Sequence, residues 1–565
     1  MTTRRDLLQA GAAAAAIVAA EGLGGFRRAI AQQQLTEAEL LNFPRLGNVT
    51  LLHVADLHGQ LRPVYLREPS VNIGFAEARG VPPHIVGREF LRHFDIPPKS
   101  PAAYALTSED FTALAKNYGR MGGLDRLATV VKAVRAERGH DRVMLLDGGD
   151  TYHGTYGSQR TKGQDVVDCY KLLKPDAGTL NWEFAYGETR LRELASGLNY
   201  PLLALNVRDP EKKRPFTAAY KIIEKGGVRI AVLGHAYPHL AAIHPASVLP
   251  PWTFGLREEE IRSAIDRARK EGVSLVVMLS QNGFDADRKL ASRVDGIDII
   301  LTAHGDDALP EPVRVGKTLL VASGSHGKFV SRLDLDVRPE GLRDFHYKLI
   351  PLFSDAIAPD AEMAAAVEKA RAPFAADLAR VVGHTESLLY RRDTFRGTFC
   401  DLMCAALLVE RDAEVSLSPG FRWGTTVLPQ SAITVEDIYN GTAISYPQVY
   451  RTSMTGQRIK DVLEDAADML CNPDPYQRTS CDMVRCGGVR YRLDPRKSVG
   501  NRISALEFLG TGKDIEPGRS YTVAGWGSVA EQVQGPPVWD VIEAHLSRIK
   551  TFRSKPQTSV RVVSG

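Results

Sequence analysis

The chain has few cysteines for its length, only six in 565 residues. None of them forms a Cys-x-x-Cys pair, so a structural zinc ribbon is not expected. Cys400 and Cys404 are four residues apart on a predicted helix and are expected to pack in the core. Cys471, Cys481 and Cys486 are close enough in sequence for one disulfide in an oxidising compartment, but their pairing stays open.

The sequence also lacks a large excess of either charge and, beyond its N-terminus, a long apolar run. The formal net charge is +4 at pH 7 and falls to about +2 without residues 1–31, which argues against a nucleic-acid-binding protein. With 44% hydrophobic and 24% charged residues, the chain has the composition and length of two or more globular domains.

The first 31 residues have the features of an export signal. The pair Arg4-Arg5 is followed by an Ala-rich apolar segment, residues 7–20, and by a small-x-small cleavage site at Ala29-Ile30-Ala31. The alternative is an N-terminal helix that is retained in the fold. Because the twin-arginine route exports folded proteins, often with their cofactor, the signal predicts a periplasmic enzyme that is loaded with metal before export.

Residues 54–60 contain the first candidate metal ligands of the chain. They follow an apolar run, residues 49–52, that predicts a buried strand, so Asp56 and His58 would lie at the strand's carboxyl end. Sheets of α/β proteins keep their sites at that end. A carboxylate and an imidazole two residues apart can bind one divalent cation together. A single Asp-x-His is common, so the interpretation depends on matching fragments downstream.

A second predicted strand, residues 143–146, ends in Asp147-Gly148-Gly149-Asp150. The glycines let the backbone approach a ligand closely, and a carboxylate placed after them, Asp150, can bridge two cations. The alternative is an ordinary Asp-Gly turn. Farther along, Asn181 follows a turn of small residues and can give a metal its amide oxygen.

Strands and helices alternate through the first part of the chain. Helices are predicted over residues 122–138 and 257–270, and strands over 228–234, 273–279 and 297–301. The last two strands are each followed by a polar cluster, which contains Gln281 in one case and His304 and Asp306 in the other. The pattern predicts a layered α/β domain with its polar clusters on one edge and a loop-rich insertion at residues 61–117.

The composition changes near residue 359. Residues 361–380 are rich in Ala, Glu, Lys and Arg and predict a linking helix, after which helices alternate with short strands in an α+β pattern. We therefore expect a signal at 1–31, a first domain at 45–355, a linker helix at 356–380 and a C-terminal substrate-binding domain at 381–560.

Taken in order, these fragments resemble the calcineurin-like metallophosphoesterases, specifically the two-domain 5′-nucleotidase family. The fragments that match are Asp56-Leu57-His58, Gly149-Asp150, Asn181-Trp182-Glu183, Ser280-Gln281-Asn282-Gly283 and His304-Gly305-Asp306. Within that family the chain is more similar to the thiosulfohydrolases of the bacterial sulfur-oxidising (Sox) system, over nearly the whole mature chain, including residues 67–72, 418–424 and 472–476. The resemblance implies a layered α/β metallophosphoesterase sandwich followed by a smaller α+β domain.

The resemblance also implies two metal ions, usually manganese. Asp56, His58 and Asp306 would hold the first ion, Asp150 would bridge, and Asn181, Gln281 and His304 would hold the second. Gln281 and Asp306 depart from the sulfur-oxidising relatives, which have histidine at both positions. Oxygen ligands there favour Mn²⁺ or Mg²⁺ over Zn²⁺, whereas the alternative is that metal affinity has been lost. His153 and His326 are near the motifs and either compensate or are ordinary core or surface histidines.

The residue after Asn181 bears on the substrate. Phosphoesterases of this family have a histidine acid there, and this chain has Trp182. A thiol has a pKa of about 8.5, so a sulfur leaving group needs no acid, which favours S–S over ester cleavage. The resemblance implies release of sulfate from an S-thiosulfonate on the cysteine of a sulfur-carrier protein, with Arg422 clamping the sulfonate. The carrier's flexible arm would enter between the domains of a monomeric enzyme that binds neither nucleic acid nor membrane.

Two other functions stay open. A periplasmic nucleotide or phosphoester hydrolase is possible in this fold, although the pair of phenylalanines that stacks the base in 5′-nucleotidases is not found around residues 446–447 and 482–484. The other function is that of a carrier-binding protein without catalysis. It is suggested by Gln281 and Asp306, which replace the histidines of the sulfur-oxidising relatives.

Overall fold

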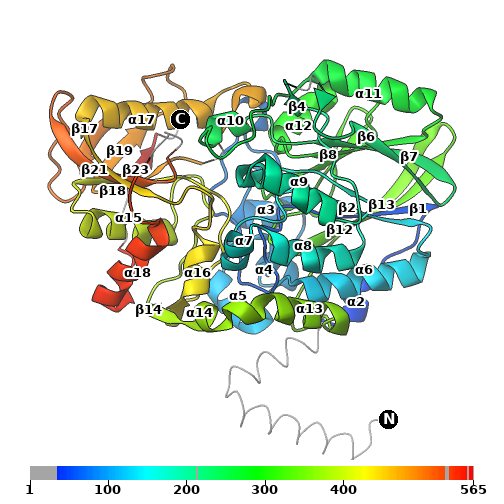
Figure 1. Cartoon of the computed structure of the whole chain (residues 1–565), viewed down its shortest axis with the longest axis horizontal. Helices are drawn as coiled ribbons and strands as arrows, with labels where there is room; N and C mark the ends of the chain where they lie inside the picture. Colours follow the sequence, from blue (N-terminus) through cyan, green and yellow to red (C-terminus); the bar gives the residue numbers. More distant parts are fainter. Residues whose placement is uncertain (1–34, 212–213, 481, 529–532, 556–558, 564–565) are drawn as a thin grey trace, which may run out of the picture.

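The computed structural model describes residues 35–211, 214–480, 482–528, 533–555 and 559–563 (Figure 1). The predicted export signal and Cys481 lie outside these ranges. The other five cysteines are free thiols, and Cys400 and Cys404 are buried as expected. No helix within the described ranges is long and apolar enough to span a membrane.

The first half of the chain forms two sheets that pack face to face. One sheet has the strand order β13-β12-β1-β2-β3, in which β1 (Val49–Val54) runs parallel to β2 (Val143–Asp147). Its other strands are β3 (Ala177–Gly178), β12 (Phe329–Arg338) and β13 (Gly341–Pro351). The second sheet has the order β10-β11-β9-β8-β7-β6, with the strands β6 (Tyr220–Lys225), β7 (Val228–His235), β8 (Leu275–Ser280), β9 (Ile299–Thr302), β10 (Val313–Val315) and β11 (Thr318–Ala322).

Alternation along these strands sorts their side chains into two layers of core. On β1, Leu51 packs between the two sheets, whereas Leu52 packs against the helices outside them. On β8, Val277 and Met278 divide in the same way. Because successive strand residues point to opposite faces, strands that are apolar throughout can be buried on both sides.

Helices cover the outer face of each sheet. The first sheet carries α6 (Leu124–Arg138), α8 (Gln164–Tyr170) and α13 (Ala361–Arg371), and α13 packs against both of the others. The second carries α11 (Glu258–Lys270) and α12 (Phe284–Arg293). The insertion after β1 contains three short helices, α3 (Gly87–His93), α4 (Pro101–Leu106) and α5 (Phe111–Tyr118). The result is the layered α/β sandwich that the sequence predicts.

The rest of the chain forms a smaller α+β domain beside the first (Figure 1). Its main sheet has the order β17-β21-β15-β18, flanked by two smaller sheets, β16-β14-β22 and β20-β19-β23. The strands are β14 (Val381–Thr385), β15 (Val415–Ser418), β16 (Ser431–Thr434), β17 (Val449–Thr455), β18 (Arg485–Gly487), β19 (Val489–Leu493), β20 (Ile503–Phe508), β21 (Ser520–Trp526), β22 (Thr551–Phe552) and β23 (Val560–Val562). The longer helices are α15 (Thr398–Glu410), α17 (Gly456–Cys471) and α18 (Val538–Ile549), with the short α16 (Val435–Asn440) beside them.

The linking helix expected at residues 361–380 is divided. Helix α13 ends at Arg371, a short 3₁₀ helix (Ala372–Phe374) follows, and α14 (Ala375–Ala379) completes the segment. Pro373 lies in the 3₁₀ turn, and proline interrupts an α-helix because it lacks the backbone N–H and clashes with the preceding turn.

Candidate metal centre

The seven predicted metal ligands all lie at the carboxyl ends of strands or directly after them. Asp56 and His58 follow β1, and Asp150 follows β2, its parallel neighbour. Gln281 follows β8, and His304 and Asp306 follow β9, again a parallel pair. Asn181 precedes the 3₁₀ helix η3 (Trp182–Tyr186). The two sheets thus bring their polar ends to one edge of the sandwich, where the side chains meet.

Three acceptors converge on the side-chain nitrogen of Asn181. Its Nδ2 lies 3.2 Å from Asp150 Oδ2, 3.0 Å from Gln281 Oε1 and 3.2 Å from His304 Nδ1. An amide nitrogen has only two hydrogens and cannot donate fully to three acceptors. This cluster coincides with the ligand set predicted for the second ion.

The ligands predicted for the first ion form a neighbouring cluster. His58 Nε2 lies 3.0 Å from Asp306 Oδ1, and His58 Nδ1 lies 3.7 Å from Asp150 Oδ2. All three side chains are buried. Asp150 therefore contacts both clusters, as a bridging carboxylate would.

Asp56 ties the two clusters together. Its Oδ1 accepts a hydrogen bond from Gln281 Nε2 at 3.0 Å, and its Oδ2 accepts one from the backbone N–H of His304 at 2.7 Å. Gln281 Nε2 also donates to the carbonyl of Gly148 at 2.7 Å. Because a carbonyl only accepts, this bond sets the orientation of the Gln281 amide and directs its oxygen towards Asn181.

Five of the predicted ligands have left-handed backbone conformations. Their φ angles are +49° at Asp56, +50° at His58, +55° at Asp150, +71° at His304 and +58° at Asp306. Side chains other than glycine rarely adopt this region, and such strain concentrates at functional sites, where the surrounding structure holds it in place. Other described residues, such as Lys162 and Arg257, share this conformation, so it supports the motif-based choice of these five residues without identifying them on its own.

The carboxylates of Asp56, Asp150 and Asp306 are buried close together without an equal number of cationic side chains. Burial raises the pKa of Asp56 well above the ordinary carboxyl value, and the negative charges of Asp306 and Asp150 raise it further. Burial also raises the pKa of Asp150, although His58 opposes the rise. For Asp306, burial is outweighed by His58 and Arg392, which together lower the pKa. The cluster would be stabilised by a bound cation.

The donor atoms fit divalent metal ions. Asp150 Oδ1 and Asn181 Oδ1 are buried and have no hydrogen-bond partner in the described structure. Within the described residues, no three His, Cys, Asp or Glu side chains are already arranged to hold a metal ion, and this includes the set of Asp56, His58 and Asp306 predicted for the first ion. Burial lowers the pKa of His304 to about 4, which keeps its imidazole neutral and able to coordinate.

Trp182 lies at the centre of an aromatic cluster beside Asn181. Tyr446 is stacked parallel to it, with 6.3 Å between ring centroids, and Phe421 and His244 approach it edge-on at 5.2 and 4.4 Å. Only 4% of Trp182 is exposed. The side chain therefore forms an apolar wall of the site and joins the two domains.

Arg422 lies at the other side of the site. Its Nη1 donates to the carbonyl of Gly305 at 3.2 Å, and its Nη2 donates to Asn72 Oδ1 at 2.8 Å. A small cavity of about 70 Å³ is lined by His304, Asn282 and Arg422 from the site and by Phe75 and Arg478 farther out. His304 therefore borders a space that water can enter.

The two accessory histidines differ. Both nitrogens of His326 are engaged, Nδ1 with Ser325 Oγ at 2.8 Å and Nε2 with the backbone N–H of Gly424 at 3.2 Å, so this side chain is a core histidine. His153 is also buried, stacks on Trp182 at 5.2 Å, and its Nε2 has no partner within the described residues.

Charged residues outside the predicted ligand set support the loop between His304 and Asp306. Arg392 donates to the carbonyl of Asp306 and to Glu68, and Glu68 also accepts from Lys328. All three side chains are buried. They come from distant parts of the chain, and isolated charged residues in sequence give no signal that they will be buried together.

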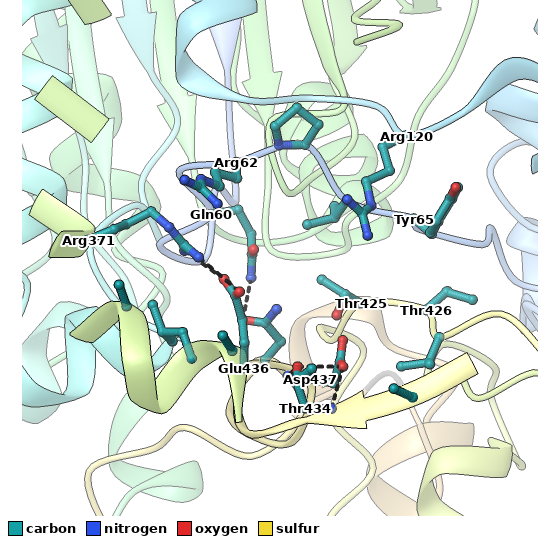
Figure 2. A pocket seen from close by; sticks show the side chains of 18 of the residues that line it. Gln60, Arg62, Tyr65, Arg120, Arg371, Thr425, Thr426, Thr434, Glu436 and Asp437 are labelled. Carbon is teal, nitrogen blue, oxygen red and sulfur yellow. Dashed lines mark hydrogen bonds and ion pairs between the residues drawn. The ribbon is translucent and has the colours of Figure 1, made fainter. Parts of the chain in front are cut away.

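A much larger cavity, about 780 Å³, lies elsewhere between the two domains and contains none of the predicted ligands. Figure 2 shows Arg371 reaching across to Glu436, with Arg120 and Tyr65 on another wall. One of its lining residues, Gln60, follows His58 by two positions in the sequence and donates to Asn440 Oδ1 at 3.2 Å.

Comparison with solved structures gives a match over almost the whole chain. The sulfate thiohydrolase SoxB of Thermus thermophilus is 33% identical, with 93% of this chain and 98% of that chain covered and a TM-score of 0.89. A 5′-nucleotidase precursor, also from Thermus thermophilus, shares the fold at 19% identity, with 92% and 99% covered and a TM-score of 0.71.

Comparison by sequence points to the same group of proteins. A model of the family described as "5′-nucleotidase, C-terminal domain" matches residues 381–540. The snake venom 5′-nucleotidase of Crotalus adamanteus is 30% identical over 189 residues, which cover 32% of this chain and 32% of that protein. The 5′-nucleotidase of Bos taurus is 23% identical over 449 residues, which cover 72% of this chain and 76% of that protein.

Proposed function

Because this chain belongs to the 5′-nucleotidase superfamily and, within it, to the family of SoxB sulfate thiohydrolases, we propose that it is a two-metal thiosulfohydrolase. Its substrate would be an S-thiosulfonate carried on a cysteine of a partner protein. Water would add to the outer, sulfonate sulfur, and the bond from this sulfur to the neighbouring sulfane sulfur would break with its electron pair going to the sulfane sulfur. The sulfane sulfur stays on the carrier's cysteine as a persulfide, and sulfate and two protons are released.

The observation that carries this proposal is the convergence on Asn181. Asp150, Gln281 and His304 direct acceptor atoms to within 3.2 Å of its amide nitrogen, and the His58–Asp306 pair lies beside them. Rotation of the Asn181 amide would add its oxygen to the same set of donors. Such a set of oxygen and imidazole donors is what a hard divalent ion binds.

The two clusters support the ligand assignment that the family resemblance implies, and we propose it here. Asp56, His58 and Asp306 would hold the first ion, Asp150 would bridge, and Asn181, Gln281 and His304 would hold the second. When bound, the ions would supply positive charge at the place where negative charge develops on the reacting group. Replacement of imidazoles by Gln281 and Asp306 makes Mn²⁺ the ion we propose.

The chain's own residues would bind and orient the sulfonate. Arg422 lines the small cavity beside His304 and would add positive charge for the sulfonate oxygens. Trp182 supplies no proton, and none is needed, because a sulfur leaving group with a thiol pKa of about 8.5 departs as an anion at neutral pH. Its ring would exclude water from one side of the S–S bond.

The partner and the compartment are also part of the proposal. An extended arm of a sulfur-carrier protein would reach the centre through the cavity lined by Phe75, Arg478 and Arg422. The enzyme would act as a monomer in the periplasm after twin-arginine export, for which the sequence of residues 1–31 is the support.

The test is parallel release of sulfate from thiosulfonate-loaded carrier protein and of phosphate from AMP by manganese-supplied mature enzyme. Sulfate release alone is expected. It should fall at least about 100-fold in Asp150→Ala, because the bridging carboxylate is lost, and stay near wild type in Asp168→Ala, which changes an aspartate of α8 outside the site. Sulfate release that survives in Asp150→Ala would contradict the two-metal mechanism.

A phosphoester hydrolase is the second candidate, favoured by the names of the sequence relatives. Phosphate release alone in the same experiment would establish it. If neither product appears and less than one ion binds per chain, a carrier-binding role without catalysis becomes the better explanation.

A further inference from the structure

Two guanidinium groups of the C-terminal domain hold consecutive carbonyls of one metal-centre loop. Arg392 donates through Nη2 to the carbonyl of Asp306, and Arg422 donates through Nη1 to the carbonyl of Gly305 at 3.2 Å. Both arginines follow β14, whereas the loop follows β9 of the first domain. Part of the metal centre is therefore held from outside the domain that carries its ligands.

Arg392 is anchored rigidly on the other side. Its Nη1 donates to Glu68 Oε2 at 2.6 Å, and Glu68 Oε1 accepts from Lys328 Nζ at 2.8 Å. Only 2% of Arg392, 5% of Glu68 and 1% of Lys328 is exposed. A buried guanidinium that is bound to a carboxylate has little freedom to reorient, so its second donor reaches a defined position.

The loop needs such support because its backbone is strained. His304 has φ +71° and Asp306 has φ +58°, with Gly305 between them. A non-glycine residue stays in this conformation only where its surroundings hold it. The carbonyl bonded by Arg392 belongs to Asp306 itself, so the bond restrains the peptide that sets the direction of the Asp306 side chain towards His58.

We propose that Arg392 is a positioning residue for Asp306 and that affinity for the metal ion therefore depends on the packing of the C-terminal domain against the first. The inference rests on the proposed two-metal site. Arg392 touches neither substrate nor metal in this view. It acts through the Asp306 peptide, and its loss would let the carboxylate leave the position in which it faces His58.

The competing explanation is that Arg392 only joins the two domains. The ion pair between Arg371 of α13 and Glu436 of α16 is a control for this explanation (Figure 2). Arg371 Nη1 donates to Glu436 Oε1 at 2.6 Å, and Nη2 donates to Oε2 at 2.9 Å. This pair also links the C-terminal domain to the preceding segment, but neither residue contacts the 304–306 loop in the described structure. Loss of general domain packing should affect both pairs alike.

The experiment measures Mn²⁺ dissociation constants of the metal-free full-length mature protein by titration calorimetry, with Mn²⁺ electron paramagnetic resonance as a second readout. Arg392→Gln is expected to weaken binding about 10- to 100-fold, the usual effect of removing a group that orients a ligand. Arg371→Gln should bind within about twofold of wild type. Wild-type affinity and an unchanged spectrum in Arg392→Gln would overturn the inference, as would equal losses in both variants.

A double-mutant cycle tests whether the effect passes through Asp306. In an Asp306→Asn background, Arg392→Gln should weaken Mn²⁺ binding no further than about twofold, because the ligand that it positions is already impaired. Full additivity would contradict the inference. If Arg392→Gln does not fold, Arg392→Lys replaces it, since an ammonium cannot span Glu68 and the Asp306 carbonyl together. No Mn²⁺ binding by wild type would instead refute the proposed function.

Discussion

His58 Nε2 lies 3.0 Å from Asp306 Oδ1, although 248 positions separate the two residues in sequence. The strands that precede them belong to different sheets, β1 and β9, whose carboxyl ends open onto the same edge. Two further carboxylates, those of Asp56 and Asp150, lie around this pair. The neighbouring cluster at Asn181 contains two amides and an imidazole besides the shared Asp150. The charge of the centre is thus concentrated on the side of His58.

We expect the amide of Gln281 to determine which metal ion the second cluster prefers. In Gln281→His an imidazole replaces an oxygen donor, and imidazole favours Zn²⁺ relative to Mn²⁺. We expect the ratio of Zn²⁺ to Mn²⁺ affinity to rise about tenfold or more, measured by competition between the two ions on the metal-free protein. Gln164→His, which changes a half-buried glutamine in the first turn of α8 and outside the predicted ligand set, is the matched control. An unchanged ratio would mean that Gln281 does not contribute a ligand.

The aromatic cluster predicts a structural role for Trp182 in addition to its place beside the site. Trp182→Ala would leave a cavity among Phe421, Tyr446 and His244 and should lower the free energy of unfolding by about 3–5 kcal/mol. Trp182→Phe keeps an aromatic ring and should lose less than half of that amount. Urea denaturation of the metal-free proteins measures both values. A stability of Trp182→Ala equal to wild type would show that the ring is not packed as described.

Much of the fold, and the gathering of the candidate ligands at one edge, could be predicted from sequence because both depend on local signals. Apolar runs that end in Asp-x-His, Gly-Asp or a polar cluster indicate strands and the ends at which sites form, and Asp56, Asp150 and His304 all lie there in the structure. Parallel pairing of β1 with β2 and of β8 with β9 places the residues of each pair side by side, and packing of the two sheets with their carboxyl ends at one edge brings the two pairs together.

The support for the ligands could not be predicted in the same way. Arg391-Arg392-Asp393 looks in sequence like a solvated charged turn, yet Arg392 is buried because Glu68, 324 positions earlier, meets it across the domain interface. Pairing over such distances leaves no periodicity or spacing to detect. The division of the linking helix is different, because it has a local cause. Pro373 interrupts the helix, and the effect of a proline on a helix can be predicted from sequence.

The buried His53 predicts that stability falls in mild acid. His53 is fully buried on β1, its Nδ1 lies 2.6 Å from Ser323 Oγ, and burial lowers its pKa to about 3. Below the ordinary histidine pKa of about 6.5, the unfolded chain binds a proton that the folded chain does not, so stability decreases as the pH falls from 6.5 towards 3. At pH 5 this group alone should reduce the free energy of unfolding by about 2 kcal/mol relative to pH 7.

The variant His53→Asn isolates that contribution. Asparagine keeps a polar atom near Ser323 and does not titrate, so the difference in unfolding free energy between pH 7 and pH 5 should shrink by about 2 kcal/mol. His140→Asn changes an exposed histidine and should retain the wild-type difference. Urea denaturation at the two pH values measures the three proteins. An undiminished difference in His53→Asn would show that His53 does not remain neutral in the folded state.

Trp423 lies beside the metal centre, with 6.4 Å between its ring centroid and that of His58, and it is stacked on Phe421. These two aromatic rings are therefore not free to hold a nucleotide base between them, which predicts poor binding of nucleotides. Their ring centroids are 5.4 Å apart with an interplanar angle of 15°, so the rings pack on each other. A base held between two rings needs contact distances of about 3.5 Å on each side, more than this separation provides. AMP should therefore bind the manganese-loaded enzyme no more than about threefold tighter than inorganic phosphate, because only the phosphate group finds partners. Calorimetric titration of both ligands gives the ratio, and inorganic sulfate provides an anion control. A tenfold preference for AMP would require that the two rings separate to admit the base, and it would move the assignment from the thiosulfohydrolases towards the nucleotidases.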